Sequence, residues 1–237
     1  LIGFVGGVYT GTLALKHGFS LGRAYPAEKA SGYILPAVLV ILLVLSVTTT
    51  LFAFSESGPG SMHAPVLLAL GGGLVFGAIA QRTRTCFAGS IRDVLLMQNF
   101  DLISIIGGFF AVMLVFNLAT GGFKLSFAGQ PVAHSQHLWN FLGMYAVGFA
   151  AVLAGGCPLR QLILAGQGSS DSAVTFLGLL VGAAFCHNFG LAGAAAAAAT
   201  ADTPAVAGGP GINGQVALIA SIVILFVIGF SPKNRKS

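Results

Sequence analysis

Seven long apolar segments occupy most of this chain, and they leave few folds open to it. The 237 residues are 56% hydrophobic and only 7% charged, whereas a soluble domain carries about 25% charged residues. A chain with so few charges cannot cover a water-facing surface, so we expect a polytopic membrane protein. The expected membrane spans are 1–15, 33–54, 66–80, 102–119, 138–154, 173–189 and 215–230.

Most of these segments are shorter than the roughly 20 residues that a perpendicular transmembrane helix needs. The segment 66–80, for example, would be only about 22 Å long as a helix. We therefore expect some helices to end partway through the membrane, with protein rather than lipid around their ends. Two further short helices are expected at 87–97 and 158–165, either as partial, re-entrant helices or as surface helices at the interface.

The basic residues are distributed unequally between the loops. If the chain crosses the membrane seven times, Lys124 falls on one face and the other Lys and Arg residues fall on the opposite face. The positive-inside rule makes that opposite face cytoplasmic, and the C-terminus lies there. The net charge of +5 therefore reflects membrane topology rather than nucleic-acid binding. The residues on the cytoplasmic face are Lys16, Arg23, Lys29, Arg82, Arg84, Arg92, Arg160, Lys233, Arg235 and Lys236.

One glycine–cysteine pattern, G-x4-G-x8-C, occurs twice with a separation of 71 residues. The register continues beyond the pattern, since Gly107 corresponds to Gly178 and Asn117 corresponds to Asn188. Repeated units in a membrane chain are how transporters build a symmetric pathway around a central site. The two copies are Gly72, Gly77 and Cys86, and Gly143, Gly148 and Cys157.

The first apolar segment is similar to the helix that follows a cysteine unit. Gly3, Gly7 and Gly11 have the same spacing as Gly178 and Gly182, and such small-residue faces let helix backbones approach closely. We therefore expect a further cysteine unit upstream of residue 1. Residues 1–237 are expected to form a single transmembrane domain, with repeat units at 67–122 and 138–193.

Cys157 is the first candidate for a functional residue. Gly155 and Gly156 precede it and permit a sharp break and close approach by a ligand, and Pro158 suits the first position of a helix. Cys157 is therefore expected at a helix N-terminus, where free N–H groups and the helix dipole attract an anion. Arg160, one turn later, adds a full positive charge.

Cys86 repeats this arrangement, with Arg82, Arg84 and Arg92 nearby. A neutral thiol offers a weak S–H donor and a polarizable sulfur, which suit a soft, sulfur-bearing anion. The alternative for a single buried cysteine is simple packing; two cysteines in equivalent positions beside Gly and Arg favour function. The arginines either line an inner vestibule that concentrates anions or serve topology alone.

Other polar residues give weaker signals. Cys186, followed by His187 and Asn188, lies inside an apolar segment, and both packing and a place in the pathway stay open. His134 and His137 have a helix-compatible spacing for a metal, but no carboxylate or cysteine is near them, which favours an interfacial structural role. The sequence has no C-x-x-C, phosphate loop, zinc spacing or nucleophile–base arrangement, so we expect neither an enzyme nor a bound cofactor or metal.

Six segments resemble a known family: 75–77, 85–93, 152–158, 57–65, 134–143 and 209–214. The first three are similar to the YeeE/YedE family of bacterial inner-membrane sulfur transporters. The last three look like the YedE branch associated with selenium metabolism.

The resemblance implies an all-helical fold with pseudo-symmetric halves, incomplete helices and an hourglass shape. It implies uptake of thiosulfate, or a related sulfur or selenium species, along cysteines in a narrow pathway. Cys86 and Cys157 match the family's pathway cysteines, whereas Cys186 matches no motif of the family. Family members often work beside a small cytoplasmic sulfurtransferase of the TusA type. The family also has a further amino-terminal part with its own cysteine motif, which these residues lack.

Two other functions stay open beside transport. A thiol-based membrane oxidoreductase would be favoured by a redox-active disulfide between Cys86 and Cys157, although the lack of C-x-x-C counts against it. A membrane anchor for a sulfurtransferase would make no use of the glycine-lined breaks. The sequence therefore favours an inner-membrane transporter for a small sulfur or selenium anion.

Overall fold

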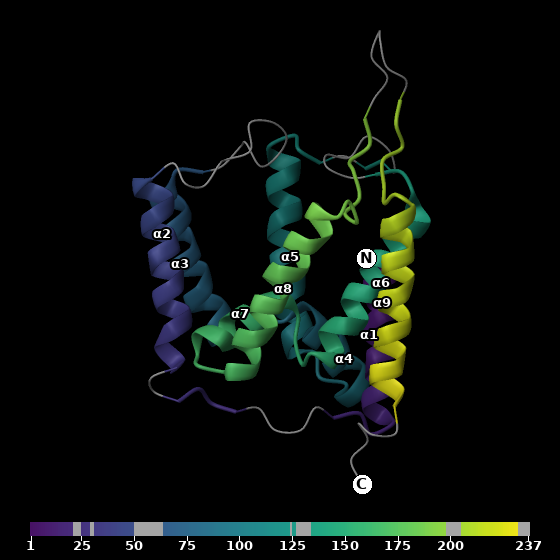
Figure 1. Cartoon of the computed structure of the whole chain (residues 1–237), viewed down its shortest axis with the longest axis horizontal. Helices are drawn as coiled ribbons and strands as arrows, with labels where there is room; N and C mark the ends of the chain where they lie inside the picture. Colours follow the sequence, from purple (N-terminus) through teal and green to yellow (C-terminus); the bar gives the residue numbers. More distant parts are fainter. Residues whose placement is uncertain are drawn as a thin grey trace.

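The structure is a computed structural model that describes residues 1–20, 25–28, 31–49, 64–123, 125–126, 134–197 and 205–231. Regular structure within these ranges is helical, apart from three isolated β-bridges (Figure 1). The elements are α1 (Ile2–Lys16), η1 (Ser31–Tyr33), α2 (Ile34–Thr48), α3 (Val66–Arg82), α4 (Phe87–Met97), α5 (Asp101–Ala119), α6 (His137–Leu153), α7 (Pro158–Gly166), α8 (Ser170–Asn188) and α9 (Ile212–Phe230).

Each of the seven apolar segments contains a helix, and the helix ends lie within a few residues of the expected ones. The predicted end of the second segment, residue 54, lies outside the described residues. The two short helices expected after the cysteines are present as α4 and α7. α3 and α6 are each 17 residues long, and they begin and end 71 positions apart.

Within the described residues, five helical segments are long and apolar enough to cross a membrane. α1 and α2 are apolar but have only 15 residues each. Six of the basic residues behind the predicted membrane orientation lie outside the described residues: Arg23, Lys29, Lys124, Lys233, Arg235 and Lys236. The five segments are Val66–Met97, Asp101–Ala119, His137–Gly166, Ser170–Asn188 and Ile212–Phe230.

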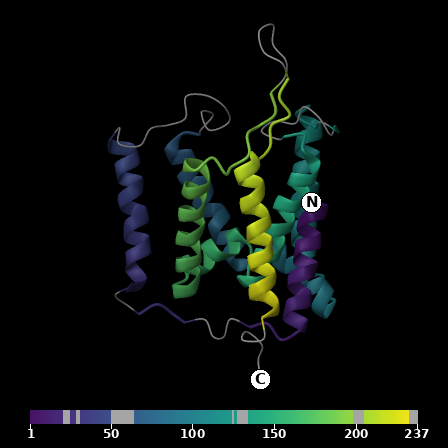
Figure 2. The ribbon, with the colours of Figure 1, turned by 45° about the vertical axis from the view of Figure 1, so that its right-hand side comes forward.

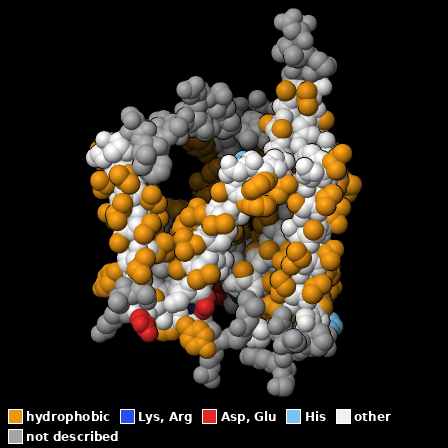
Figure 3. All heavy atoms as spheres, in the orientation of Figure 1, with side chains coloured by type: hydrophobic (Ala, Val, Ile, Leu, Met, Phe, Trp, Pro, Cys, Tyr) orange, Lys and Arg blue, Asp and Glu red, His pale blue; other side chains and the backbone are white. Residues whose placement is uncertain are grey.

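The outward sides of the helices carry apolar side chains, as a membrane-embedded surface requires. Val112, Val181 and Val227 are each more than 60% exposed. Figure 3 shows hydrophobic side chains over α2, α8 and α9, with acidic side chains near the lower end of the same view. These helices therefore present to their surroundings the surface that a soluble protein would bury.

The closest helix contact joins α1 and α6. Gly3 and Gly7 lie against the backbone of Phe141 and Tyr145, so that a Cβ at either glycine would overlap a carbonyl oxygen. The Tyr145 hydroxyl also donates a hydrogen bond to Thr10 Oγ1 at 2.8 Å. The expected packing role of the first glycine face is confirmed. By contrast, no described atom lies within 4 Å of a Cβ built at Gly178 or Gly182 of α8.

α9 lies alongside the α1–α6 pair, and α2 stands apart at the opposite side of the molecule (Figures 1 and 2). Phe149 of α6 is fully buried, and its ring packs edge-on against Phe226 of α9 with 5.1 Å between centroids. A second buried cluster extends from α1 and α6 to the starts of α4 and α7, and it therefore positions both cysteines. Its members are Phe4, Val8, Cys86, Ala88, Ala151, Val152 and Cys157.

Candidate functional site

Each of the two cysteines is the N-cap residue of a short helix. Cys86 precedes α4 and Cys157 precedes α7, both with extended backbone conformations. Pro158 is the first residue of α7, where its missing N–H costs no hydrogen bond. The expected place of Cys157 at a helix N-terminus is confirmed, and Cys86 has the same place.

The backbone makes the same kind of turn between each long helix and its cysteine. After α3, the Thr85 N–H donates to the carbonyl oxygen of Ala80 at 3.1 Å. After α6, the Gly156 N–H donates to the carbonyl oxygen of Ala151 at 2.9 Å. Such bonds satisfy carbonyl groups at a helix C-terminus and require one residue in the left-handed region.

Different residues occupy the left-handed position in the two turns. Gly155 has φ of 81° after α6, and Arg84 has φ of 53° after α3. The left-handed conformation is unfavourable for a residue with a Cβ by about 1–2 kcal/mol. Backbone geometry therefore explains why a glycine stands at position 155. It does not explain why an arginine stands at position 84, so the Arg84 side chain must have a role other than forming the turn.

The two cysteines are in contact. The Cys157 N–H donates to Cys86 Sγ at 3.4 Å, and the Gly89 N–H donates to the same sulfur at 3.2 Å. Cys86 is 6% exposed and Cys157 is 3% exposed, and both are free thiols. Two cysteines 71 positions apart in the sequence thus meet in the structure, and the Cys86 sulfur accepts one hydrogen bond from its own helix α4 and another from the backbone before α7.

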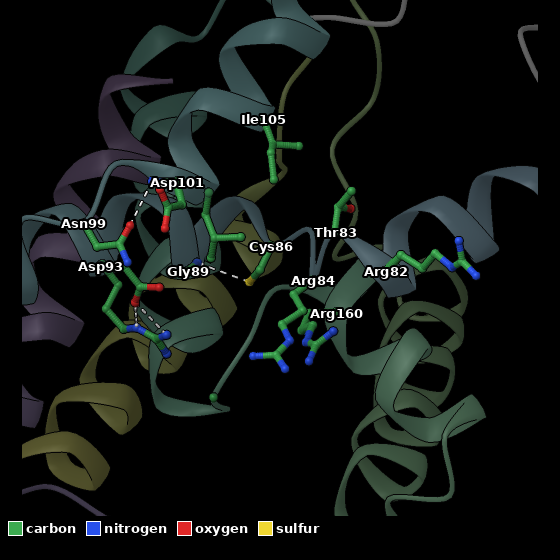
Figure 4. A pocket seen from close by; sticks show the side chains of 13 residues that line it. Arg82, Thr83, Arg84, Cys86, Gly89, Asp93, Asn99, Asp101, Ile105 and Arg160 are labelled. Carbon is green, nitrogen blue, oxygen red and sulfur yellow. Dashed lines mark hydrogen bonds and ion pairs between the residues drawn. The ribbon is translucent and has the colours of Figure 1, made fainter.

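A cavity of about 440 Å³ opens beside Cys86 (Figure 4). All four arginines singled out from the sequence line this cavity, together with Gly155. Cys157 and Gly156 do not line it. The remaining lining residues are Thr83, Gly89, Asp93, Asn99, Asp101, Leu102 and Ile105, and the arginines are Arg82, Arg84, Arg92 and Arg160.

The cavity carries a net positive charge, because four arginines face two aspartates. Arg92 is paired at 2.8 Å with Asp93, its neighbour on the short helix α4. Arg160 Nη1 is buried and has no hydrogen-bond partner. An unpaired buried guanidinium nitrogen is costly to leave unsatisfied, so the cavity is suited to an anion.

Sequence reasoning did not single out several polar residues at the site. The Asp101 N–H donates to Asn99 Oδ1 at 2.8 Å, which ties the polar turn before α5. Gln161 is 4% exposed, and its Nε2 donates to the carbonyl oxygen of Ala154 at 2.6 Å. Gln161 thereby joins the end of α6 to α7. A glutamine among the apolar residues of this short helix is the sequence signal that could have identified Gln161.

Cys157 lines a different cavity of about 520 Å³, whose lining is almost entirely apolar. Among the residues around it are Phe4, Phe110, Met144 and Leu159. The cysteine contact therefore lies between a charged cavity on the Cys86 side and an apolar one on the Cys157 side.

The structure places Cys186 elsewhere. It lines a cavity of about 280 Å³ with His134 and Trp139, separate from the cavities at the cysteine pair. His187 and Asn188 are exposed at the end of α8, and the Asn188 side chain bonds a carbonyl of its own helix. Among the described residues, no group of three or more His, Cys, Asp or Glu side chains is arranged to hold a metal.

Two curated relatives are similar to part of this chain. The thiosulfate transporter TsuA of Spirochaeta thermophila is 31% identical over 110 residues, which cover 45% of this chain and 32% of the relative. The thiosulfate transporter TsuA of Escherichia coli is 28% identical over 124 residues, which cover 51% of this chain and 34% of the relative. The matches thus span about a third of the length of these relatives. No solved structure matches the chain.

The family model described as Sulphur transport matches residues 82–236, more than half of the chain. That match begins at the last residue of α3 and includes both cysteines, the arginine cavity and the helices from α4 to α9. The helices long and apolar enough to cross a membrane are what a transport protein requires. The chain belongs to the Sulphur transport family.

Proposed function

We propose that this protein carries a small sulfur-containing anion across the membrane past the contact between Cys86 and Cys157. The observation that carries the proposal is this contact itself, made by two N-cap cysteines beside an arginine-lined cavity. Helix N-termini present free N–H groups and a positive dipole end to an anion. The arginines raise the local concentration of anions at the cavity.

The cargo is a thiosulfate-like anion, which combines negative charge with a soft sulfur atom. The thiols supply a polarizable surface and a weak S–H donor for the soft end. Gly155 leaves the backbone open for close approach, and no described atom lies within 4 Å of a Cβ there. The names of the two relatives support thiosulfate, and a selenium analogue of the same geometry is the alternative cargo.

The pathway is built from two pseudo-symmetric units, with α4 and α7 as re-entrant helices that meet at the narrow centre of an hourglass. The 71-residue offset between α3 and α6 supports this arrangement. In the same arrangement Arg82, Arg84, Arg92 and Arg160 line an inner vestibule, and the chain ends in the cytoplasm of a bacterium. Cys186, His187 and Asn188 lie outside this pathway.

A thiol-based oxidoreductase is the second candidate, and one observation favours it. Two free thiols in contact are placed for a disulfide that would open and close with redox state. Transport is preferred because the contact is flanked by the positively charged cavity, which a dithiol exchange between buried cysteines does not require.

The test is uptake of radiolabelled thiosulfate by cells that lack their own thiosulfate importers and express the full chain. Cys157→Ala should abolish uptake without loss of folded protein, because removal of one sulfur costs less than a deep core truncation of about 2–5 kcal/mol. Cys157→Ser keeps a donor but lacks the soft sulfur, so it should also lose most uptake.

Cys186→Ala is the matched control, since it removes a thiol from a separate cavity and should leave uptake unchanged. Normal uptake by folded Cys157→Ala protein would refute the pathway. Uptake that depends on an oxidant, with a Cys86–Cys157 disulfide detected by mass spectrometry, would favour the oxidoreductase instead.

A further inference from the structure

The chain has two helix breaks, one between α3 and α4 and one between α6 and α7. Arginine and glycine occupy each other's positions when the two breaks are aligned. At the 71-residue offset, Arg84 corresponds to Gly155, and Gly89 corresponds to Arg160. All four of these residues line the cavity of about 440 Å³ beside Cys86. At these two paired positions, each break therefore has one arginine and one glycine, in opposite order.

The other two arginines are placed differently. Arg92 is neutralised by Asp93 at 2.8 Å. Arg84 and Arg160 both line this cavity, and in the view of Figure 4 both side chains are drawn below Cys86, whereas that of Arg82 points away from them. Within the described residues, neither Arg84 nor Arg160 forms an ion pair. Two of the four positive charges are thus left for a ligand at this position.

Both free arginines are held at a cost. Arg160 Nη1 is buried without a partner, and Arg84 occupies the left-handed region with φ of 53°. Two like charges in one cavity also repel each other. These costs are offset when an anion with two negative charges lies between the guanidinium groups, because each planar fork can donate two hydrogen bonds to oxygen atoms.

We infer that Arg84 and Arg160 form a two-armed clamp that selects a dianion with several oxygen acceptors. This inference rests on the proposed function, because it takes the cavity to lie on the path of the cargo. The oxygen end of the anion lies between the two guanidinium groups and its soft sulfur end lies toward Cys86, which lines the same cavity. A soft monoanion such as thiocyanate lacks both the second charge and the oxygen atoms.

The test compares binding of sodium thiosulfate and sodium thiocyanate by isothermal titration calorimetry, at constant ionic strength, to the full chain in lipid nanodiscs. Arg84→Gln and Arg160→Gln should each weaken thiosulfate binding about tenfold or more, as expected for loss of a charge-assisted hydrogen bond. Their effect on thiocyanate should stay below about threefold, the size of a screened long-range charge effect. Lys16→Gln is the matched control, because Lys16 is an exposed cation at the end of α1 that does not line the cavity, and it should change either affinity by less than about threefold.

Lysine variants separate charge from geometry. Arg160→Lys keeps the charge and loses the fork, so its thiosulfate affinity should also fall about tenfold. Wild-type affinity in this variant would overturn the clamp, as would equal losses for the two anions or equal losses for Lys16→Gln and Arg84→Gln. If Arg84→Gln does not fold, Arg84→Gly takes its place, because glycine adopts the left-handed turn without strain.

Uptake by the same proteins in liposomes distinguishes the two proposals. The expected binding pattern without any thiosulfate uptake would reject transport and retain the clamp. Uptake that is insensitive to both Arg84→Gln and Arg160→Gln would reject the clamp and retain transport.

Discussion

The break between α3 and α4 and the break between α6 and α7 have the same backbone design and different chemistry. In both, a long helix ends in a left-handed turn and a cysteine caps the next helix. The first break has Arg84 in the turn and its cysteine lines a charged cavity. The second has Gly155 in the turn and its cysteine lines an apolar cavity. The same backbone arrangement thus occurs twice, and it places one cysteine at a charged cavity and the other at an apolar cavity.

The helices that precede the breaks differ as well. Gly148 of α6 lies against the backbone of Phe4, so that a Cβ there would overlap its carbonyl oxygen. Gly77 occupies the corresponding position of α3, and no described atom lies within 4 Å of a Cβ there. The second unit is therefore packed into the α1–α6 contact, and the first unit is much less constrained.

The largest difference in stability between variants of the two regions should appear when Gly148 and Gly77 are substituted. Gly148→Leu should prevent α1 from packing on α6, at a cost above the roughly 1–3 kcal/mol of ordinary overpacking, because backbone rather than a flexible side chain blocks the space. Gly77→Leu should be tolerated. Thermal unfolding followed by size-exclusion chromatography in detergent measures both, and equal destabilisation by the two substitutions would contradict the comparison.

A smaller difference is expected between the cysteines. Cys86→Ala leaves the N–H groups of Gly89 and Cys157 without their acceptor, and a buried unsatisfied donor costs about 1–3 kcal/mol. Cys157 contributes its backbone N–H to this contact, and an alanine at that position retains the N–H. The melting temperature of Cys86→Ala should therefore lie below that of Cys157→Ala. The reverse order would mean that the Cys86 sulfur is not a structural acceptor.

The smallest effects concern the left-handed position, and they have opposite signs. Gly155→Ala introduces a Cβ at φ of 81° and should destabilise by about 1–2 kcal/mol. Arg84→Gly removes the same strain and should stabilise by up to about 1 kcal/mol, while thiosulfate uptake falls. Unfolding and uptake measured on the same preparations test this prediction. A less stable Arg84→Gly protein with full uptake would show that Arg84 serves the fold rather than the cargo.

Much of the architecture was predictable because it depends on composition and local pattern. Apolar segments located the helices to within a few residues, and the Gly-Gly-Cys-Pro sequence located the start of α7. The Arg92–Asp93 pair was predictable because both residues lie on one short helix. α1 has the 15 residues that its apolar segment predicts, whereas α2 ends at Thr48, earlier than the segment 33–54 predicts.

The amino-acid sequence alone specifies the membrane-protein class, the helices, the two cysteine-capped breaks and the candidate residues around them, because these follow from hydropathy, glycine and proline geometry, and charge. Tertiary packing decided which candidates share a cavity. It placed Cys86 with the arginines, Cys157 with apolar residues and Cys186 in a third cavity. It also left Arg160 Nη1 buried without a partner. The physical reason is that burial and ion pairing depend on contacts between helices far apart in the chain, which no local pattern encodes.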